Sequence, residues 1–238
     1  MLLKAAINGR RTRSEHPAAP ITAGQQAMEA ARAVRAGAGA IHVHPRDKQG
    51  RESLAPDDVA ASLEAIRASC PSVPIGVSTG AWIVPEFDRR LLLIEGWAVL
   101  PDFTAVNFHE PGALLVAQVL LQKGIALEAG IWNAEAAAVF RGSGLSNDCL
   151  RILIEPGQEA GNARERFAAV ESVLEGLKNP RLLHGSEASA WTFIALAGEA
   201  GYDTRIGLED TLTLPDGSQA RDNGELVSAA WKILPRRQ

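Results

Sequence analysis

Short apolar runs alternate with longer segments of helical periodicity along the chain. The runs have the length and composition of buried strands, and they cover residues 2–7, 40–44, 73–78, 103–107, 125–130, 150–154, 181–184 and 204–208. The intervening segments carry helix start signals: Thr22 and Gln25 have the spacing of a capping box, and Pro56 precedes two acids. Strands that alternate with helices pair in parallel through right-handed crossovers. Eight such strands predict an α/β fold of the closed (β/α)8 barrel type.

The chain length fits one such barrel without a second domain. A (β/α)8 barrel of 238 residues is of ordinary size, and no low-complexity linker divides the sequence. Asp216-Gly217 is a turn signal inside an alternating segment. We therefore expect a single barrel domain over residues 1–238, with a small hairpin near residues 212–220.

Composition and charge exclude several classes of partner. The net charge of −4 provides no whole-molecule attraction for nucleic acid or for an anionic membrane. No stretch approaches the roughly 18 apolar residues that span a bilayer, and Arg10 and Arg11 follow the first apolar run, whereas a secretory signal has its charges first. Cys70 and Cys149 lie far apart in the sequence, which fits free thiols in a reducing compartment. The sequence predicts a cytoplasmic protein without nucleic-acid or membrane partners.

Titratable and polar residues gather where the predicted strands end. In a (β/α)8 barrel the loops after the strands build the functional site. The strand-end residues are Asn8 with Arg10 and Arg11, His42 with His44, Ser78 with Thr79, Asn107 with His109, Glu128, Glu155, His184 with Glu187, and Glu209 with Asp210.

His42 and His44 give the sharpest chemical signal. Residues i and i+2 of a strand point to the same face, so both imidazoles project together. Two histidines with a carboxylate from another strand form a catalytic metal site with open positions. Glu209, Glu128 and Glu155 all qualify as the third ligand on position alone.

Residues 76–80 also match the G-x-S-x-G pattern of a nucleophile elbow. That elbow needs a helix to begin at the serine, and Pro85 instead pushes Val84 toward an extended conformation. We therefore expect Ser78 and Thr79 to bind substrate through hydrogen bonds, with a serine hydrolase as the less favoured alternative.

Three arginines suit an anionic ligand. Arg10 and Arg11 follow the first strand, where guanidinium groups pair with carboxylate or phosphate, although a solvated loop explains them equally well. Arg205 lies inside the eighth strand and needs an anionic partner to offset its desolvation.

The blocks 38–47, 78–80 and 205–210 together resemble the β-keto acid cleavage enzymes, of which 3-keto-5-aminohexanoate cleavage enzyme is one. The resemblance implies a zinc-containing (β/α)8 barrel in which a β-keto acid and acetyl-CoA exchange acyl parts, giving acetoacetate and a new acyl-CoA. It also implies a homodimer or homotetramer. By motif, the resemblance assigns the zinc ligands to His42, His44 and Glu209, the proton-transferring residue to Asp210, its tuning partner to Arg205, and substrate binding to Ser78 and Asn107.

Two positions depart from the family pattern. An arginine, Arg10 or Arg11, stands about where many relatives carry a substrate-binding glutamate, which favours an acidic or neutral substrate over an amino-bearing one. On the fifth strand, Glu128 keeps the first acid of an E-x-E pair, and Gly130 replaces the second. We expect Glu128 to be catalytic, with Glu155, His184 and Glu187 as candidates for the lost acid's place.

The residues leave other functions open. The same barrel and metal would serve an aldolase, retro-Claisen hydrolase or decarboxylase that uses no CoA. A non-catalytic barrel that binds a metal and a small carboxylate is the alternative from another class.

Overall fold

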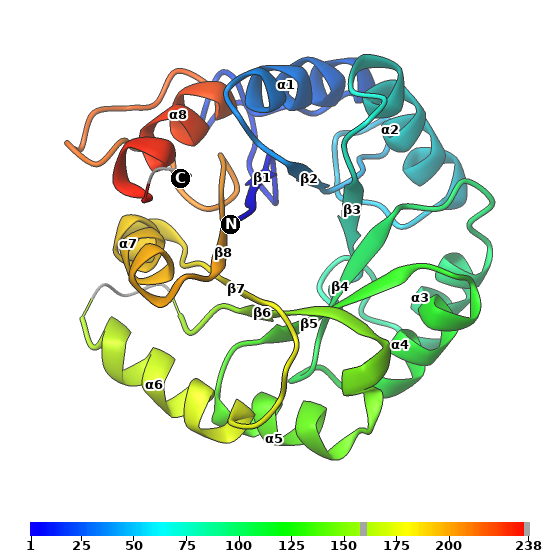
Figure 1. The fold of residues 1–238 in the computed structure, drawn as a ribbon. Coiled ribbons are helices and arrows are strands. Elements are labelled where there is room, and N and C mark those ends of the chain that lie inside the picture. Colours follow the sequence, from blue (N-terminus) through cyan, green and yellow to red (C-terminus); the bar gives the residue numbers. More distant parts are fainter. Residues whose placement is uncertain (158–160, 236–238) are drawn as a thin grey trace.

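The predicted (β/α)8 barrel is confirmed. The structure is a computed structural model, and it describes residues 1–157 and 161–235. The strands pair in parallel and in sequence order. The first strand, β1 (Leu3–Ala6), pairs with both β2 (Ala40–Val43) and β8 (Asp203–Ile206) and so closes the ring. Figure 1 shows the helices as an outer ring around the strands, with α8 (Asn223–Ile233) beside α1 (Ala23–Arg35).

The strands match the apolar runs that predict them to within two residues at either end, and four of them end one or two residues before their runs do. They are β1 (Leu3–Ala6), β2 (Ala40–Val43), β3 (Ile75–Ser78), β4 (Phe103–Asn107), β5 (Ala126–Ile131), β6 (Cys149–Ile154), β7 (Arg181–Leu183) and β8 (Asp203–Ile206). His44, His184 and Glu209 therefore lie in the loops just past β2, β7 and β8. These loops are where functional side chains of a (β/α)8 barrel gather.

The helices begin largely where their start signals predict. They are α1 (Ala23–Arg35), α2 (Pro56–Ser69), α3 (Phe87–Glu95), α4 (Ala113–Gln122), α5 (Ala134–Gly142), α6 (Ala163–Leu174), α7 (Ala190–Ala200) and α8 (Asn223–Ile233). Thr22 and Gln25 form the predicted capping box of α1. The sequence pattern does not single out α3, because this short helix buries only Arg90 and Ile94 and so has a narrow apolar stripe.

Most of the core lies between the strands and the helices, because a parallel sheet is buried on both of its faces and the helices cover the outer one. The ring interior has a smaller apolar cluster of Ala105, Leu153 and Leu182. It also holds a charged pair, because Lys4 on β1 contacts Glu128 on β5, from the opposite side of the ring, at 2.5 Å. Both side chains are fully buried, so this ion pair fills space that aliphatic side chains fill in many barrels.

The segment after β8 folds back on itself before α8. Thr213 and Gln219 form an antiparallel bridge, and the amide of Leu214 donates to the carbonyl of Ser218 at 2.8 Å. Within the part of the chain that the structure describes, no helix combines the length and the apolar character needed to cross a membrane.

Candidate metal centre and active site

A cavity of about 600 Å³ opens at the C-terminal ends of the strands. It brings together most of the residues singled out in the sequence. Those that line it are Arg10, Arg11, His42, His44, Ser78, Asn107, Glu155, Glu187, Arg205, Glu209 and Asp210. Thr79 and Glu128 do not line it.

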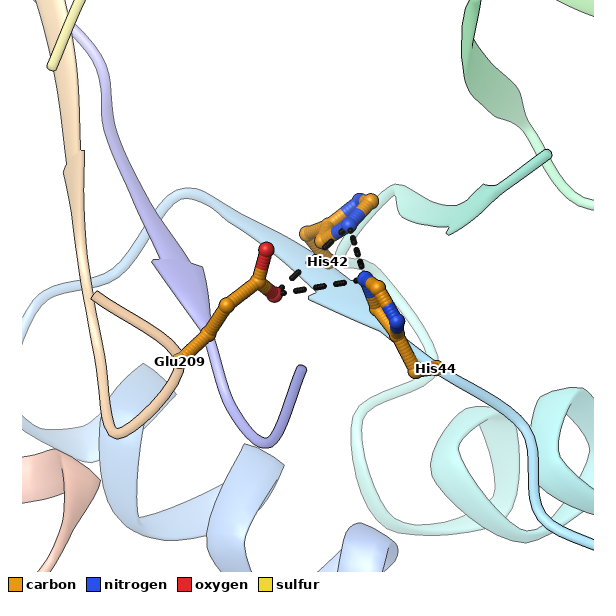
Figure 2. Close-up of side chains that lie close together, drawn as sticks. All are labelled: His42, His44 and Glu209. Carbon is orange, nitrogen blue, oxygen red and sulfur yellow. Dashed lines mark hydrogen bonds and ion pairs between the residues drawn. The ribbon is translucent and has the colours of Figure 1, made fainter. Parts of the chain in front are cut away.

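His42, His44 and Glu209 all line this cavity. Their side chains point toward one another, as Figure 2 shows. The two Nε2 atoms are 3.1 Å apart, and Oε2 of Glu209 lies 3.7 Å from that of His42 and 3.5 Å from that of His44. The histidines come from the end of β2, and the glutamate reaches over from the loop after β8. The strand ends thus deliver three ligand-type atoms to one point.

The donor set and its spacing fit a divalent cation. A point equidistant from the three atoms lies about 2 Å from each, close to the roughly 2.0–2.2 Å that zinc keeps from nitrogen and oxygen ligands. The buried Oε2 of Glu209 has no hydrogen-bond partner among the described residues. A cation at this point would give that oxygen a partner, because a buried carboxylate oxygen without one is costly.

The electrostatics of the triad also favour a bound cation. Burial keeps the pKa of His42 well below its usual value, so this imidazole is neutral and able to donate a lone pair. Burial also opposes charge on His44, but the carboxylates of Glu209 and Glu52 outweigh it and raise the pKa of His44 to about 9. The carboxylates therefore favour positive charge at this point, and a divalent cation would supply that charge in place of the proton on His44.

Arg205 and Asp210 form a buried pair beside the triad. The guanidinium group of Arg205 donates to Oδ1 of Asp210 at 2.7 and 3.1 Å and to Oε1 of Glu209 at 2.8 Å. These contacts leave Oδ2 of Asp210 without a partner among the described residues. Burial, opposed by Arg205 and reinforced by Glu209, raises the pKa of Asp210 to about 7. Asp210 is thus a stronger base than a solvated aspartate, with one oxygen free to accept a proton.

Glu155 and His184 extend this group across the cavity. Nε2 of His184 lies 3.4 Å from Oε2 of Glu155, and its Nδ1 lies 3.7 Å from Oδ1 of Asp210. Burial keeps the pKa of His184 well below its usual value and raises the pKa of Glu155 to about 7. Of the three candidates for the place of the lost second acid, Glu155 and Glu187 line the cavity, and His184 contacts Glu155. Glu187 is also paired with Arg11.

Glu128 lies outside the cavity, in the ring interior. Its carboxylate pairs with Lys4 at 2.5 Å and with Arg151 at 3.2 Å, and its side chain is fully buried. The strand-end expectation does not hold here because β5 runs on to Ile131, which leaves Glu128 in mid-strand. Thr79 turns to the neighbouring strand, where its hydroxyl donates to the carbonyl of Ala105 at 2.9 Å.

Ser78 and Asn107 offer polar groups on the cavity wall next to two tryptophans, Trp82 and Trp132. Gly130 pairs in register with Asn107. A Cβ atom at position 130 would lie 2.6 Å from Oδ1 of Asn107. The missing acid on β5 therefore leaves space that the Asn107 side chain occupies. The helix after β3 begins at Phe87, so Ser78 is not at the start of a helix as a nucleophile elbow requires.

The mouth of the cavity carries two arginines in different situations. Arg11 contacts the carboxylates of Glu187 and Glu15 and the carbonyl of Leu208. Arg10 is exposed and lines the cavity. It takes part in no ion pair among the described residues, so it is the mouth cation that can meet an incoming anion.

Glu52 is a site residue that the strand-end rule does not find. It follows β2 by nine residues, in a short hairpin that returns to His44. Its Oε1 is 2.5 Å from Nδ1 of His44 and accepts the indole N–H of Trp82 at 3.2 Å. The only sequence signal is an acid eight residues after a predicted ligand, a spacing with no regular geometry of its own.

The chain matches the family described as beta-keto acid cleavage enzyme over residues 1–238. A 3-oxoadipate:acetyl-CoA acetyltransferase of Cupriavidus necator is 38% identical over 247 residues, which cover 95% of this chain and 86% of the relative. A 3-keto-5-aminohexanoate cleavage enzyme of Fusobacterium nucleatum is 29% identical over 249 residues, covering 98% of this chain and 90% of the relative.

Solved structures of ObcA share the barrel. Apo ObcA superposes with a TM-score of 0.68 at 19% identity, covering 91% of this chain and 61% of ObcA. Its ternary complex with a C4-CoA adduct and oxalate gives 0.69 at 18% identity, covering 91% and 63%. This chain thus spans less than two thirds of ObcA, and the likeness establishes the fold alone. The family match over the full length and the 38% identical relative show more: the chain belongs to the beta-keto acid cleavage enzyme family.

Proposed function

We propose that this protein is a zinc-dependent enzyme that exchanges acyl parts between an acidic β-keto acid and acetyl-CoA. The products would be acetoacetate and a new acyl-CoA. The acetyl group of acetyl-CoA becomes bonded to the carboxymethyl fragment of the keto acid, and the remaining acyl part of the keto acid becomes bonded to CoA. The observation that supports this most is the adjacency of the His42, His44 and Glu209 triad to Asp210, all on one cavity. Family membership supports the reaction class.

The residues around the triad suit removal of a proton next to a keto group. Oδ2 of Asp210 is unpartnered and faces no competing donor among the described residues, so it can accept the α-proton of the keto acid. Arg205 holds the other oxygen of Asp210 in place at 2.7 Å. Zinc bound by the triad would supply a Lewis acid for the keto oxygen. Ser78 and Asn107 are available to hold the substrate carboxylate or the thioester by hydrogen bonds.

Arg10 supports an acidic substrate. It lies at the cavity mouth without an acidic partner among the described residues, whereas the acids near it, Glu15 and Glu187, are held by Arg11. An ammonium group would meet a free cation here, and a carboxylate would meet a partner. The relative from Cupriavidus necator is named for 3-oxoadipate, a keto acid with a second carboxylate.

The test is a set of incubations of the zinc-loaded enzyme with acetyl-CoA and short β-keto acids that end in a carboxylate, a methyl or an amino group. We expect acetoacetate and a new CoA thioester in a one-to-one ratio, fastest with the dicarboxylic keto acid. Consumption of keto acid without CoA thioester exchange would assign the protein to CoA-independent cleavage instead. No consumption of any keto acid, with or without CoA, would contradict both activities.

A further inference from the structure

Glu52 joins a wall of the cavity to one of the metal-ligand histidines. Its Oε1 lies 2.5 Å from Nδ1 of His44 and 3.2 Å from the indole nitrogen of Trp82. Nδ1 of His44 is the nitrogen that points away from the triad, because Nε2 faces Glu209 at 3.5 Å. We propose that Glu52 is a positioning residue for the metal centre. The proposal rests on the metal site of the proposed function.

The hydrogen bond to Glu52 sets the tautomer of the His44 ring. A carboxylate can only accept, so Nδ1 must donate, and the lone pair of a neutral ring then lies on Nε2. The same hydrogen bond increases the donor strength of the ring and fixes its plane. Glu52 thereby selects the orientation in which His44 can serve as a ligand.

His42 provides an internal contrast. Its Nδ1 is buried and has no hydrogen-bond partner among the described residues. No hydrogen bond on the Nδ1 side therefore holds the His42 ring, whereas His44 has a carboxylate behind it. Because the two rings meet edge to face with centroids 5.1 Å apart, a rotation of His44 would also disturb His42. Glu52 is placed to hold both rings through one contact.

A tight hairpin brings Glu52 to this position. The amide of Asp47 donates to the carbonyl of Arg51 at 2.8 Å, and the amide of Ser53 donates to the carbonyl of Pro45 at 2.9 Å. Asp47 closes the turn, with Oδ1 accepting the amides of Gln49 and Arg51 at 2.9 Å each. Asp47 thus supports the hairpin without contacting the triad, which makes it a matched control for Glu52.

Trp82 fixes Glu52 from the other side. Its ring lies over Gly80, where a Cβ atom would be 2.3 Å from the ring carbons. The ring is roughly parallel to His44, with centroids 6.3 Å apart and an interplanar angle of 23°. Trp82 is also 40% exposed and lines the cavity. The series Trp82, Glu52 and His44 therefore runs from the cavity surface to the triad.

The experiment compares metal binding by the purified full-length protein and its E52A, E52Q and D47N variants. Zinc affinity is measured by competition with a chromophoric chelator, and the cobalt-loaded proteins are compared by their visible absorption spectra. Loss of a carboxylate behind a ligand histidine typically weakens metal binding about 10–100-fold. We expect that loss for E52A with an altered cobalt spectrum, a smaller loss for E52Q, and wild-type behaviour for D47N.

Two further variants locate the effect. W82F keeps an aromatic side chain but removes the indole N–H together with the five-membered ring, so Glu52 loses one hydrogen bond and keeps its contact with His44; we expect a smaller weakening than in E52A. G80A would displace the Trp82 ring and should resemble W82F. Circular dichroism checks that each variant is folded, and E52Q tests the proposal if E52A is not.

The outcomes separate this inference from the proposed function. Wild-type zinc affinity and an unchanged cobalt spectrum in folded E52A or E52Q would overturn the positioning role. An equal loss in D47N would also overturn it, since the hairpin rather than the carboxylate would then be responsible. If the wild type binds neither metal, both the inference and the zinc site fail. If metal binding behaves as expected and no acyl exchange occurs, only the proposed reaction fails.

Discussion

Arg205 donates a hydrogen bond to Oε1 of Glu209 at 2.8 Å and thereby leaves Oε2 of that carboxylate facing the two histidines. The same nitrogen is 2.7 Å from Oδ1 of Asp210. One guanidinium group therefore orients a ligand of the triad and the proposed base at once. Substitutions of Arg205 and of Asp210 should for this reason have different effects on metal binding.

Replacing Arg205 should affect both stability and the metal centre. In R205M two buried carboxylates lose their cation, and breaking such a pair costs about 3–5 kcal/mol of unfolding free energy. We expect weaker zinc binding as well, because Glu209 loses the contact that orients it. Urea denaturation and chelator competition measure the two effects. The exposed Arg164–Glu199 pair is the control, since R164M should cost less than about 1 kcal/mol.

Replacing Asp210 should lower turnover and leave metal binding unchanged. D210N keeps the shape of the side chain and removes the proton acceptor, so we expect acetoacetate formation to fall by about 10²–10⁴-fold. Zinc content should stay at the wild-type level, because Glu209 keeps its hydrogen bond to Arg205. Full turnover in a zinc-loaded D210N enzyme would remove Asp210 from the mechanism.

Replacing Arg10 should change substrate preference without changing the metal centre. R10A removes the mouth cation, and a charge-assisted hydrogen bond of about 1.5–3 kcal/mol corresponds to roughly a 10–100-fold loss in kcat/KM for a dicarboxylic keto acid. The keto acid with a methyl end should react at nearly the wild-type rate. Steady-state kinetics with both substrates check this. An equal loss for both would mean that Arg10 does not contact the distal carboxylate.

The pH dependence of stability should report on Glu155. Burial raises the pKa of Glu155 from 4.5 in model peptides to about 7. Between these values the folded protein holds a proton that the unfolded chain has released, so the unfolding free energy falls as pH rises. E155Q lacks this proton, and its stability relative to wild type should increase by up to about 3 kcal/mol from pH 4.5 to pH 8.

Urea denaturation of the metal-free proteins at several pH values measures the effect at position 155. The exposed Glu165 on α6, replaced by glutamine, serves as the control and should run parallel to wild type. A constant difference between E155Q and wild type across this range would contradict the raised pKa.

Glu128 should matter for stability and not for substrate binding. E128L leaves the fully buried Lys4 without its partner at 2.5 Å, which should cost about 3–5 kcal/mol. The double variant K4M/E128L also removes the Lys4 charge and should recover the part of that loss that stems from Lys4, since Arg151 keeps its contact with Asp203. Denaturation of K4M, E128L and the double variant measures the coupling between the two side chains. A KM change in a stable K4M/E128L enzyme would restore a catalytic role for Glu128.

The position of strand ends allowed most of the polar cavity lining to be predicted from sequence. His42 and His44 meet because strand residues i and i+2 share a face, and Arg205 has the anionic partners that its place in a strand demands. The same rule misplaces Glu128, because β5 extends three residues beyond it and the side chain faces the ring interior. An apolar run shows that a strand exists, but a boundary shift of a few residues decides whether a side chain reaches the cavity.

Glu52 marks a different limit. Its contact with His44 depends on how a turn of about five residues folds back, and no periodic pattern encodes that distance. Turn residues such as Asp47 and Gly50 indicate a reversal of the chain. They do not show which of the following side chains will reach the strand end.

The pairing of β1 with β8 has a consequence for how the protein is made. Glu209 is synthesised long after His44, and the two become neighbours only when β8 docks on β1. Such distant pairing is slow compared with local helix formation. A metal ion that needs all three ligands would bind only after the ring has closed, and by mass action would then hold the finished barrel shut.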